Sequence, residues 1–198
     1  MKNLIITFVL ALFSIGASAQ NAKSILDKTA ALCSSGAVQA KFTAKASQGV
    51  GSGTLVAQGN KFTLQSNQAT IWFDGKTEWS LVSGSGEVNI TEPTAKEIAS
   101  MNPMNFVNLY KSGYKLSAKT VGIDYEVHLT ATSNKKEIKE MYIVVSKSSY
   151  KPKVVKLRTG KDWTVITVNS FNQIGKKPDS FFKFNVKDHP KAQIIDMR

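Results

Sequence analysis

The residues with the greatest potential for chemistry in this chain are one cysteine and two histidines. His128 occupies a polar position in an alternating stretch, and His189 stands before Pro190 near the C-terminus. Neither has the spacing to further ligands or nucleophiles that a zinc site or a catalytic triad requires. Cys33 falls on the apolar side of a predicted helix, which favours packing over nucleophilic chemistry. We therefore expect no enzymatic activity, no metal and no cofactor.

An aromatic hairpin is the strongest local signal in the sequence. Asp74-Gly75 predicts a two-residue type I′ turn between strands at 71–73 and 77–81. Trp72 and Trp79 flank this turn and supply more aromatic area than a tight turn needs. Two interpretations stay open at this point: a packed core hairpin, or part of the lining of an apolar ligand cavity.

The first nineteen residues have the pattern of a secretory signal peptide. Lys2 gives a charged start, an apolar run follows over 4–13, and Ala17-Ser18-Ala19 is a small-residue cleavage site. We expect cleavage after Ala19, a single domain over 20–198, and a soluble periplasmic protein. No cysteine follows the cleavage site directly, which argues against a lipid anchor.

The chain carries a formal net charge of +12, almost wholly from lysine, and its only arginines are Arg158 and Arg198. Nucleic-acid sites favour arginine, which grips phosphates and bases with two parallel hydrogen bonds. Nucleic acid is therefore excluded as an expected partner. An anionic membrane surface or an acidic protein stays open, although a charge excess of this kind also serves solubility.

The periodicity of the remaining chain is mainly that of strands. A short amphipathic helix beginning at a capping box, 24–27, ends at Gly36, and strict alternation over 38–46 predicts a half-buried strand. A second helical segment lies between Thr94 and Gly113. Ten or eleven strands joined by short turns exceed what an open sheet holds without curling. The predicted fold is mainly β with two or three short helices: a strongly curved, unclosed antiparallel half-barrel with a helical lid.

With the elements in this order, the chain resembles a divergent branch of the periplasmic outer-membrane lipoprotein carrier family, the Lol carrier proteins. The resemblance covers nearly the whole mature chain. It rests on the following motifs: Ile25-Leu26-Asp27-Lys28, Phe42-Thr43, Gly53-Thr54-Leu55, Asn60-Lys61-Phe62, Asp74-Gly75-Lys76-Thr77 followed by Trp79, and Phe182-Lys183-Phe184.

The resemblance implies a monomeric carrier whose apolar cavity takes the acyl chains of a lipoprotein from an inner-membrane release complex and hands them to an outer-membrane acceptor. Each buried methylene contributes about 0.8 kcal/mol, so shielding acyl chains from water needs no covalent chemistry. The family cavity positions matched here are Leu26, Phe42, Phe62 and Leu64, with Met104 and Val107 on the lid segment. Alternation alone adds Trp72 or Trp79.

One position departs from the family pattern. The family has a buried arginine, bonded to the lid helices, four residues before the position of Phe62, and this chain has Gln58 there. The resemblance thus makes Gln58 the candidate latch of the lid. An uncharged amide forms weaker hydrogen bonds than arginine, about 0.5 to 1.5 kcal/mol against 1.5 to 3.

Two other classes of function compete with the carrier. The same half-barrel with its interior filled by its own side chains would serve as a cell-envelope interaction or lipid-sensing module. A hydrolase of envelope lipids is the weakest alternative, because no nucleophile has recognisable partners. The sequence names no particular cargo, donor or acceptor.

Overall fold

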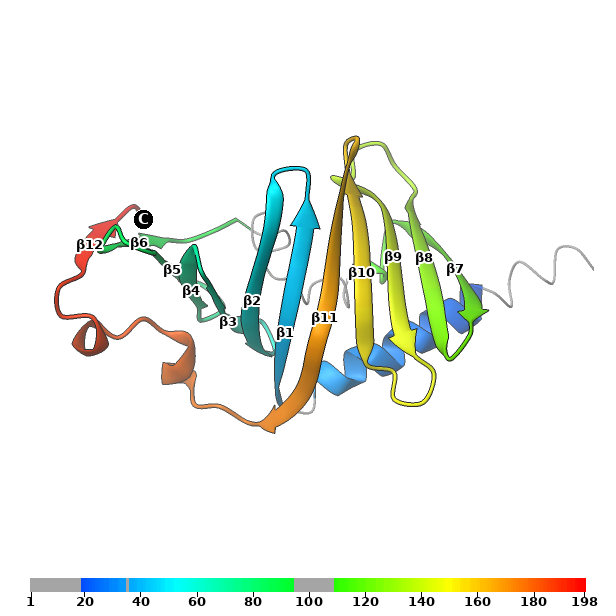
Figure 1. The fold of residues 1–198 in the computed structure, drawn as a ribbon, viewed down its shortest axis with the longest axis horizontal. Helices are drawn as coiled ribbons and strands as arrows, with labels where there is room; N and C mark the ends of the chain where they lie inside the picture. The colour runs from blue at the N-terminus through cyan, green and yellow to red at the C-terminus, as the bar shows by residue number, and fades with distance from the viewer. Residues whose placement is uncertain (1–18, 35, 95–108) are drawn as a thin grey trace, which may run out of the picture. The chain divides into compact units, whose positions relative to one another are not determined.

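The computed structural model describes residues 19–34, 36–94 and 109–198, and this part of the chain is mainly β-structure (Figure 1). Its twelve strands are hydrogen-bonded in the order β12-β6-β5-β4-β3-β2-β1-β11-β10-β9-β8-β7. The edges β12 and β7 are not paired with each other, so the sheet does not close. The predicted mainly β, unclosed sheet with a helix packed against it is therefore confirmed.

The strand bounds are β1 (Ala37–Ala46), β2 (Gly49–Gln58), β3 (Lys61–Ser66), β4 (Ala69–Phe73), β5 (Glu78–Val82), β6 (Glu87–Thr91), β7 (Tyr114–Val121), β8 (Asp124–Ala131), β9 (Ile138–Ser146), β10 (Pro152–Thr159), β11 (Asp162–Gly175) and β12 (Gln193–Asp196). Two short 3-10 helices, η2 (Asp179–Phe182) and η3 (Val186–Asp188), lie between β11 and β12. The chain forms two compact units, Met1–Ala30 with Val107–Val165 and Ala31–Phe106 with Ile166–Arg198.

The first unit buries one face of the N-terminal helix (residues 19–34) and one face of strands β8 to β10. Buried helix residues recur every three or four positions, as one face of an α-helix requires: Ala22, Ile25, Leu26 and Thr29. The strands contribute Val127, Leu129, Met141, Ile143, Val145 and Val155. The hydroxyl of Thr29 donates to the carbonyl of Tyr150, 3.0 Å away in the turn before β10.

The second unit contains the meander β1 to β6, whose two faces carry different residues. Directly paired residues of neighbouring strands share a face of a sheet. Phe62 is paired with Ala57 in β2 and with Phe73 in β4. Trp72 is paired with Thr63 in β3 and with Trp79 in β5. Because Trp72 and Phe73 are successive residues of one strand, these two sets lie on opposite faces, which we call the Phe62 face and the Trp72 face.

The aromatic hairpin is present, but its turn differs from the prediction. Phe73 is paired with Glu78, so the loop has four residues, Asp74 to Thr77, instead of two. Gly75 has a φ of 101°, whereas Asp74 has no positive φ. Asp74 Oδ1 instead accepts hydrogen bonds from the backbone N–H groups of Lys76 and Thr77, at 3.0 and 2.9 Å. The aspartate closes the loop through its side chain, so it does not need the strained backbone of a type I′ turn.

Two further predictions were wrong in detail. The N-terminal helix already includes residues 19–23, so Ser24 is inside it and does not cap its start. β12 was not predicted, and it pairs with β6 in parallel, with Gln193 opposite Glu87, so the sheet is not purely antiparallel. The predicted lid segment around Met104 and Val107 lies outside the residues that the structure describes.

Candidate functional site

An apolar surface on the Phe62 face is the best-formed part of the predicted cavity. One cross-strand row runs through Val38, Ala57, Phe62 and Phe73, and the next through Ala40, Leu55, Leu64 and Ile71. The rings of Phe62 and Phe73 pack with centroids 5.3 Å apart. Strict alternation in β1 and β3 places these side chains together, so the face was predictable from the sequence.

Phe42 extends this surface because Gly53, its partner in β2, has no side chain. A Cβ atom at Gly53 would stand 3.1 Å from the Phe42 ring and 2.7 Å from the carbonyl oxygen of Gln65. The glycine thus leaves the space that the ring occupies. The structure therefore brings Phe42, Phe62 and Leu64 onto one face, and their lining of a ligand cavity stays a prediction.

The accessibility of this face decides what it can bind. Phe62 and Phe73 have 0% and 1% of their surface exposed. Phe42 and Leu64 are half-buried. In this conformation a ligand could reach Phe42 and Leu64, but it would meet Phe62 only after whatever covers that ring moves away.

The tryptophans do not belong to this surface. Trp72 and Trp79 are directly paired in β4 and β5, so both lie on the Trp72 face, opposite Phe62. Alternation left open which of the two tryptophans faces the same way as Phe62. Because they share a face, neither of them does. Leu26 is fully buried in the helix of the first unit. Met104 and Val107 fall in the segment that the structure does not describe.

Gln58 ends β2, and its amide binds a different segment from the one expected. Its Nε2 donates to the carbonyl oxygen of Lys177 at 3.2 Å, and its Oε1 accepts from the backbone N–H of Lys177 at 2.8 Å. Lys177 lies just after β11 and is the second residue of a segment, residues 176–192, that we call the strap. Both polar groups of Gln58 thus bind the strap, and its role as a latch stays a prediction, because the lid segment lies outside the described residues.

Further contacts fix the strap across the Trp72 face. Phe182 is fully buried in a core cluster with Ala37 and Val56. Lys61 forms an ion pair with Asp179 at 2.6 Å. Lys183 Nζ lies 3.5 Å from a carboxylate oxygen of Asp74.

Asp74 is held as a carboxylate by its surroundings. Burial alone would raise its pKa, but the backbone hydrogen bonds from Thr77 and Lys76 and the charge of Lys183 outweigh burial and hold the pKa below its usual range. The Asp74 loop and the strap are therefore joined through a charged group.

Three aromatic rings meet where the strap crosses β4. Phe184 lies edge-on to Trp72 with centroids 5.5 Å apart, and His189 is also edge-on to Trp72 at 5.8 Å. Phe184 and His189 stack on each other at 5.2 Å. The sequence alone gave His189 no role beyond excluding it from a zinc site or a catalytic triad. The resemblance of Phe182-Lys183-Phe184 to a family motif was the one signal that pointed to this segment.

His128 and Cys33, the other candidates for chemistry, have surroundings that are typical of structural residues. His128 Nε2 lies 2.9 Å from Glu140, and its ring stacks on Tyr142 at 4.3 Å. Hydrogen bonds from Tyr142, Arg158 and His128 lower the pKa of Glu140. Burial raises the pKa of the Cys33 thiol to about 12. Across residues 19–34, 36–94 and 109–198, no three His, Cys, Asp or Glu side chains form a group that could hold a metal ion.

Comparison with protein families identifies the class of protein to which this fold belongs. The model of the outer membrane lipoprotein carrier protein LolA matches residues 12–161. The chain therefore belongs to the LolA-like family, as the sequence motifs indicated. A search of curated proteins finds no significant match. Of the helices in the described part of the chain, none is long and apolar enough to cross a membrane.

Several solved structures are similar in fold. A conserved protein from Thermus thermophilus has a TM-score of 0.60 at 13% identity, covering 89% of this chain and 99% of that one. A DUF1329 family protein from Desulfovibrio piger has a TM-score of 0.50 at 11% identity, covering 84% and 97%. A LolA superfamily protein from Nitrosomonas europaea has a TM-score of 0.45 at 12% identity, covering 84% and 98%. At these identities the first two support the fold alone.

Proposed function

We propose that this protein is a non-enzymatic periplasmic carrier that shields the acyl chains of lipoproteins, or of another lipid, on the Phe62 face. The observation that supports this most directly is the continuous apolar surface of Phe42, Phe62 and Leu64 in a chain of the lipoprotein carrier family. By resemblance, the donor is an inner-membrane lipoprotein-release complex and the acceptor an outer-membrane protein. The signal peptide over 1–19 would deliver the chain to the compartment between them.

The energetics of such a carrier follow from burial. Acyl chains gain about 0.8 kcal/mol for each methylene removed from water, while a phenylalanine contributes about 1.5 to 3 kcal/mol when fully covered. A carrier must also release its cargo, so its surface has to be covered when empty. The full burial of Phe62 and Phe73 is what a closed, empty carrier would show.

Binding of a synthetic triacylated lipopeptide, measured by native mass spectrometry and by titration, tests this proposal. Phe42→Ser should weaken binding about tenfold, since most of one phenylalanine contact is lost. Lys45→Ser is the matched control, because Lys45 is an exposed residue of the same strand that points to the opposite face. Equal affinities for wild type and both variants would exclude the Phe62 face as the binding surface.

One observation favours a second candidate, a cell-envelope interaction or lipid-sensing module. The absence of exposed surface on Phe62 is also what a permanently self-filled interior would show. A protein of this kind would not bind the lipopeptide and would carry no lipid after purification from a membrane-containing lysate. Native mass spectrometry of that preparation therefore separates the two functions.

A further inference from the structure

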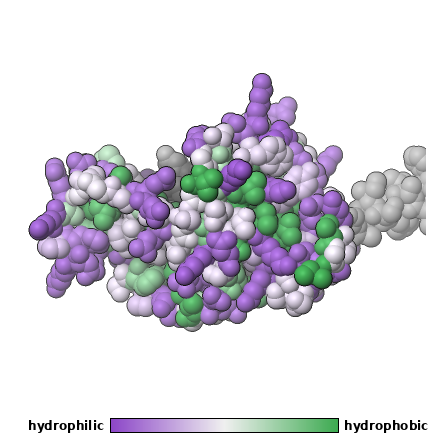
Figure 2. Space-filling view, in the orientation of Figure 1, coloured by the Kyte–Doolittle hydropathy of each residue, from purple (hydrophilic) through white to green (hydrophobic). Residues whose placement is uncertain are grey.

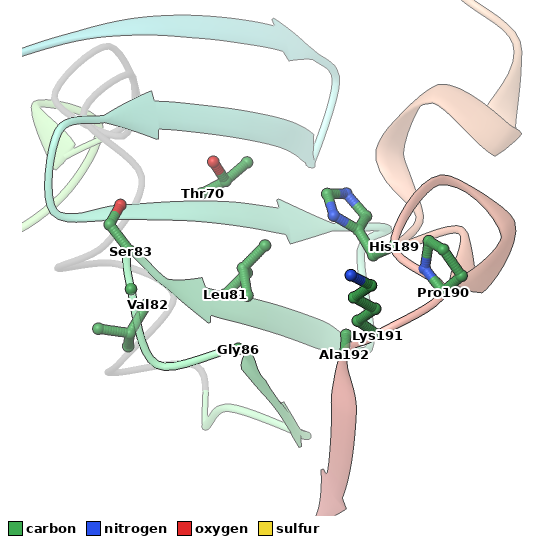
Figure 3. Close-up of a pocket in the computed structure, with 10 residues that line it drawn as sticks. Thr70, Leu81, Val82, Ser83, Gly86, His189, Pro190, Lys191 and Ala192 are labelled. Atoms are coloured by element: carbon green, nitrogen blue, oxygen red, sulfur yellow. The ribbon is translucent and has the colours of Figure 1, made fainter.

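Two neighbouring open hollows lie between the strap and the Trp72 face. The larger, of about 1020 Å³, lies between the strap and strands β3 and β4. The smaller, of about 470 Å³, lies between the end of the strap and the residues where β5 ends and turns toward β6 (Figure 3). Thr70 and His189 line both, so the two hollows meet at this pair. We call the whole the strap cleft.

The two parts of the strap cleft differ in chemistry. The smaller hollow is bordered mainly by apolar groups, including Leu81, Val82, Pro190 and Ala192. Figure 3 shows Thr70 and Leu81 rising from neighbouring strands, with His189, Pro190 and Lys191 coming from the strap. The larger hollow combines aromatic rings with neutral polar groups such as Thr63, Gln65 and Asn185. An occupant with an apolar end and a polar end would match both parts.

The charge of the strap cleft is positive. Lys183, Lys187 and Lys191 line it at intervals of four residues. Lys183 is partly neutralised by Asp74, 3.5 Å away, whereas Lys187 and Lys191 form no ion pair within the part of the chain that the structure describes. Asp188 is the carboxylate in the lining, and it accepts a hydrogen bond from Asn185 at 3.0 Å. The surplus of lysines favours an anionic group on the occupant.

The surface of this part of the molecule has the same mixed character. Figure 2 shows mainly hydrophilic residues, coloured purple, at the left of the view, where Figure 1 places the strap and β12. Smaller areas of hydrophobic residues, coloured green, lie between them. A wholly apolar ligand would suit such a surface less well than one with a charged group at one end.

A peptide strand fits this cleft poorly. The floor is the face of β3, β4 and β5, whose backbone groups are already paired within the sheet. A bound strand needs a free sheet edge for its main-chain hydrogen bonds. An acyl chain has no such requirement and packs against apolar side chains alone.

We infer that the strap cleft is a second ligand site, which binds a single-chain anionic amphiphile. The acyl chain lies in the smaller hollow against Leu81, Pro190 and Ala192. The anionic head group lies in the larger hollow near Lys183 and Lys187, while the long stem of Lys191 covers the chain and its ammonium group reaches water. A fatty acid and a lysophospholipid share this chemistry. The site is on the face opposite Phe62 and does not depend on the proposed carrier function.

Quenching of tryptophan fluorescence by a dibrominated stearate locates the chain. The variant Trp79→Phe/Trp163→Phe keeps Trp72, which lines the cleft, and the variant Trp72→Phe/Trp79→Phe keeps Trp163 in the first unit. Saturable quenching of Trp72, with Trp163 unaffected, is the expected result. Equal quenching of both tryptophans, or of neither, would overturn the inference.

Charge reversal tests the head group. Lys187→Glu should weaken stearate binding about tenfold, because it removes one attraction to the head group and adds one repulsion. Lys161→Glu changes the net charge equally on an exposed residue of the first unit and should leave binding unchanged. Equal weakening by both variants would show that only the overall charge matters and would contradict the site.

Competition identifies the source of the ligand and separates it from the carrier function. Stearate or lysophosphatidylglycerol should displace the brominated probe at least about tenfold better than the uncharged dodecyl maltoside. The tighter of the two anionic lipids shows whether a carboxylate or a phosphate is preferred. Quenching should persist in Phe42→Ser, whose effect is confined to lipopeptide binding. Loss of quenching in that variant would place the fatty acid on the Phe62 face and overturn the inference, whatever the result for the lipopeptide.

Discussion

Gln58 and Lys177 form two hydrogen bonds, with the side-chain amide of one donating to and accepting from the backbone of the other at 3.2 and 2.8 Å. Gln58 is the last residue of β2 and Lys177 is the second residue of the strap, so this pair fixes where the strap leaves β11. The side-chain amide of Gln58 thus pairs with the Lys177 backbone as a neighbouring strand would, at the point where β2 has ended. The two bonds therefore hold the beginning of the strap, the segment that borders the strap cleft.

Replacing Gln58 by alanine should loosen the strap selectively. Loss of both bonds leaves the Lys177 backbone to water and should lower the free energy of unfolding by about 1 to 3 kcal/mol. Hydrogen exchange should accelerate across residues 176–181 and remain unchanged in β8 and β9. Gln39→Ala, a half-buried glutamine of β1 on the same face, is the control. Unchanged exchange in the strap would show that Phe182 and the Lys61–Asp179 pair hold it without Gln58.

Gly75 should tolerate alanine much less well than Gly59, the glycine of the β2–β3 hairpin. Gly75 has a φ of 101°, and an added Cβ would stand 2.6 Å from Nδ2 of Asn60. Gly75→Ala therefore combines backbone strain with displacement of Asn60, and we expect a loss of about 2 to 3 kcal/mol in the free energy of unfolding.

Gly59 provides the matched comparison for that experiment. Its φ is 61°, and an added Cβ meets nothing within 4 Å. Gly59→Ala should lower the free energy of unfolding by only about 1 kcal/mol, the cost of placing a residue with a Cβ atom in a left-handed backbone conformation. Chemical denaturation of both variants measures the difference, and equal losses would mean that the contact with Asn60 contributes nothing.

The faces of the sheet were predictable from alternation, whereas the strap was not. Phe42, Phe62 and Leu64 alternate with polar neighbours, and period two fixes the face of each side chain once the strands exist. For Trp72 and Trp79, alternation left open which of the two faces the cavity. A hairpin loop with an even number of residues, whether the predicted two or the four that form, places both tryptophans on one face.

The strap escaped prediction because nothing periodic marks it. It contains two 3-10 helices of four and three residues, and its position depends on contacts with residues more than a hundred positions away, such as Gln58. Such contacts leave no local pattern in a single sequence. For the same reason the parallel pairing of β12 with β6, and the role of His189 beside Trp72, appear only in the fold.

Cys33 should react slowly with thiol reagents in the native protein. Burial raises the pKa of its thiol to about 12, so the reactive thiolate is scarce at pH 8. We expect alkylation by iodoacetamide to be at least about a hundredfold slower than in the same protein unfolded in guanidinium chloride. Mass spectrometry over time measures both rates. Similar rates in the two states would show that the thiol is open to solvent.

The carboxylate of Asp27 has two hydrogen-bond partners that favour its charged form. The Tyr110 hydroxyl donates to Asp27 at 2.5 Å, and Lys23 pairs with the same carboxylate at 2.7 Å. Hydrogen bonds from Lys23 and Tyr110 hold the pKa of Asp27 below its ordinary value in the folded protein. A carboxyl whose pKa is lower in the folded state than in the unfolded state makes stability depend on pH at acidic values.

Asp27 should therefore stabilise the fold above about pH 4, and this contribution should be lost as the pH falls through the lowered pKa. Its side chain is 46% exposed, so solvent screening limits the effect to about 1 kcal/mol. Asp27→Asn should unfold more easily than wild type at pH 7 and equally easily near pH 2, while the exposed Asp162→Asn should match wild type throughout. Denaturant titrations at both pH values measure this. A difference between Asp27→Asn and wild type that stays constant from pH 7 to pH 2 would show that Asp27 acts through packing and not through its charge.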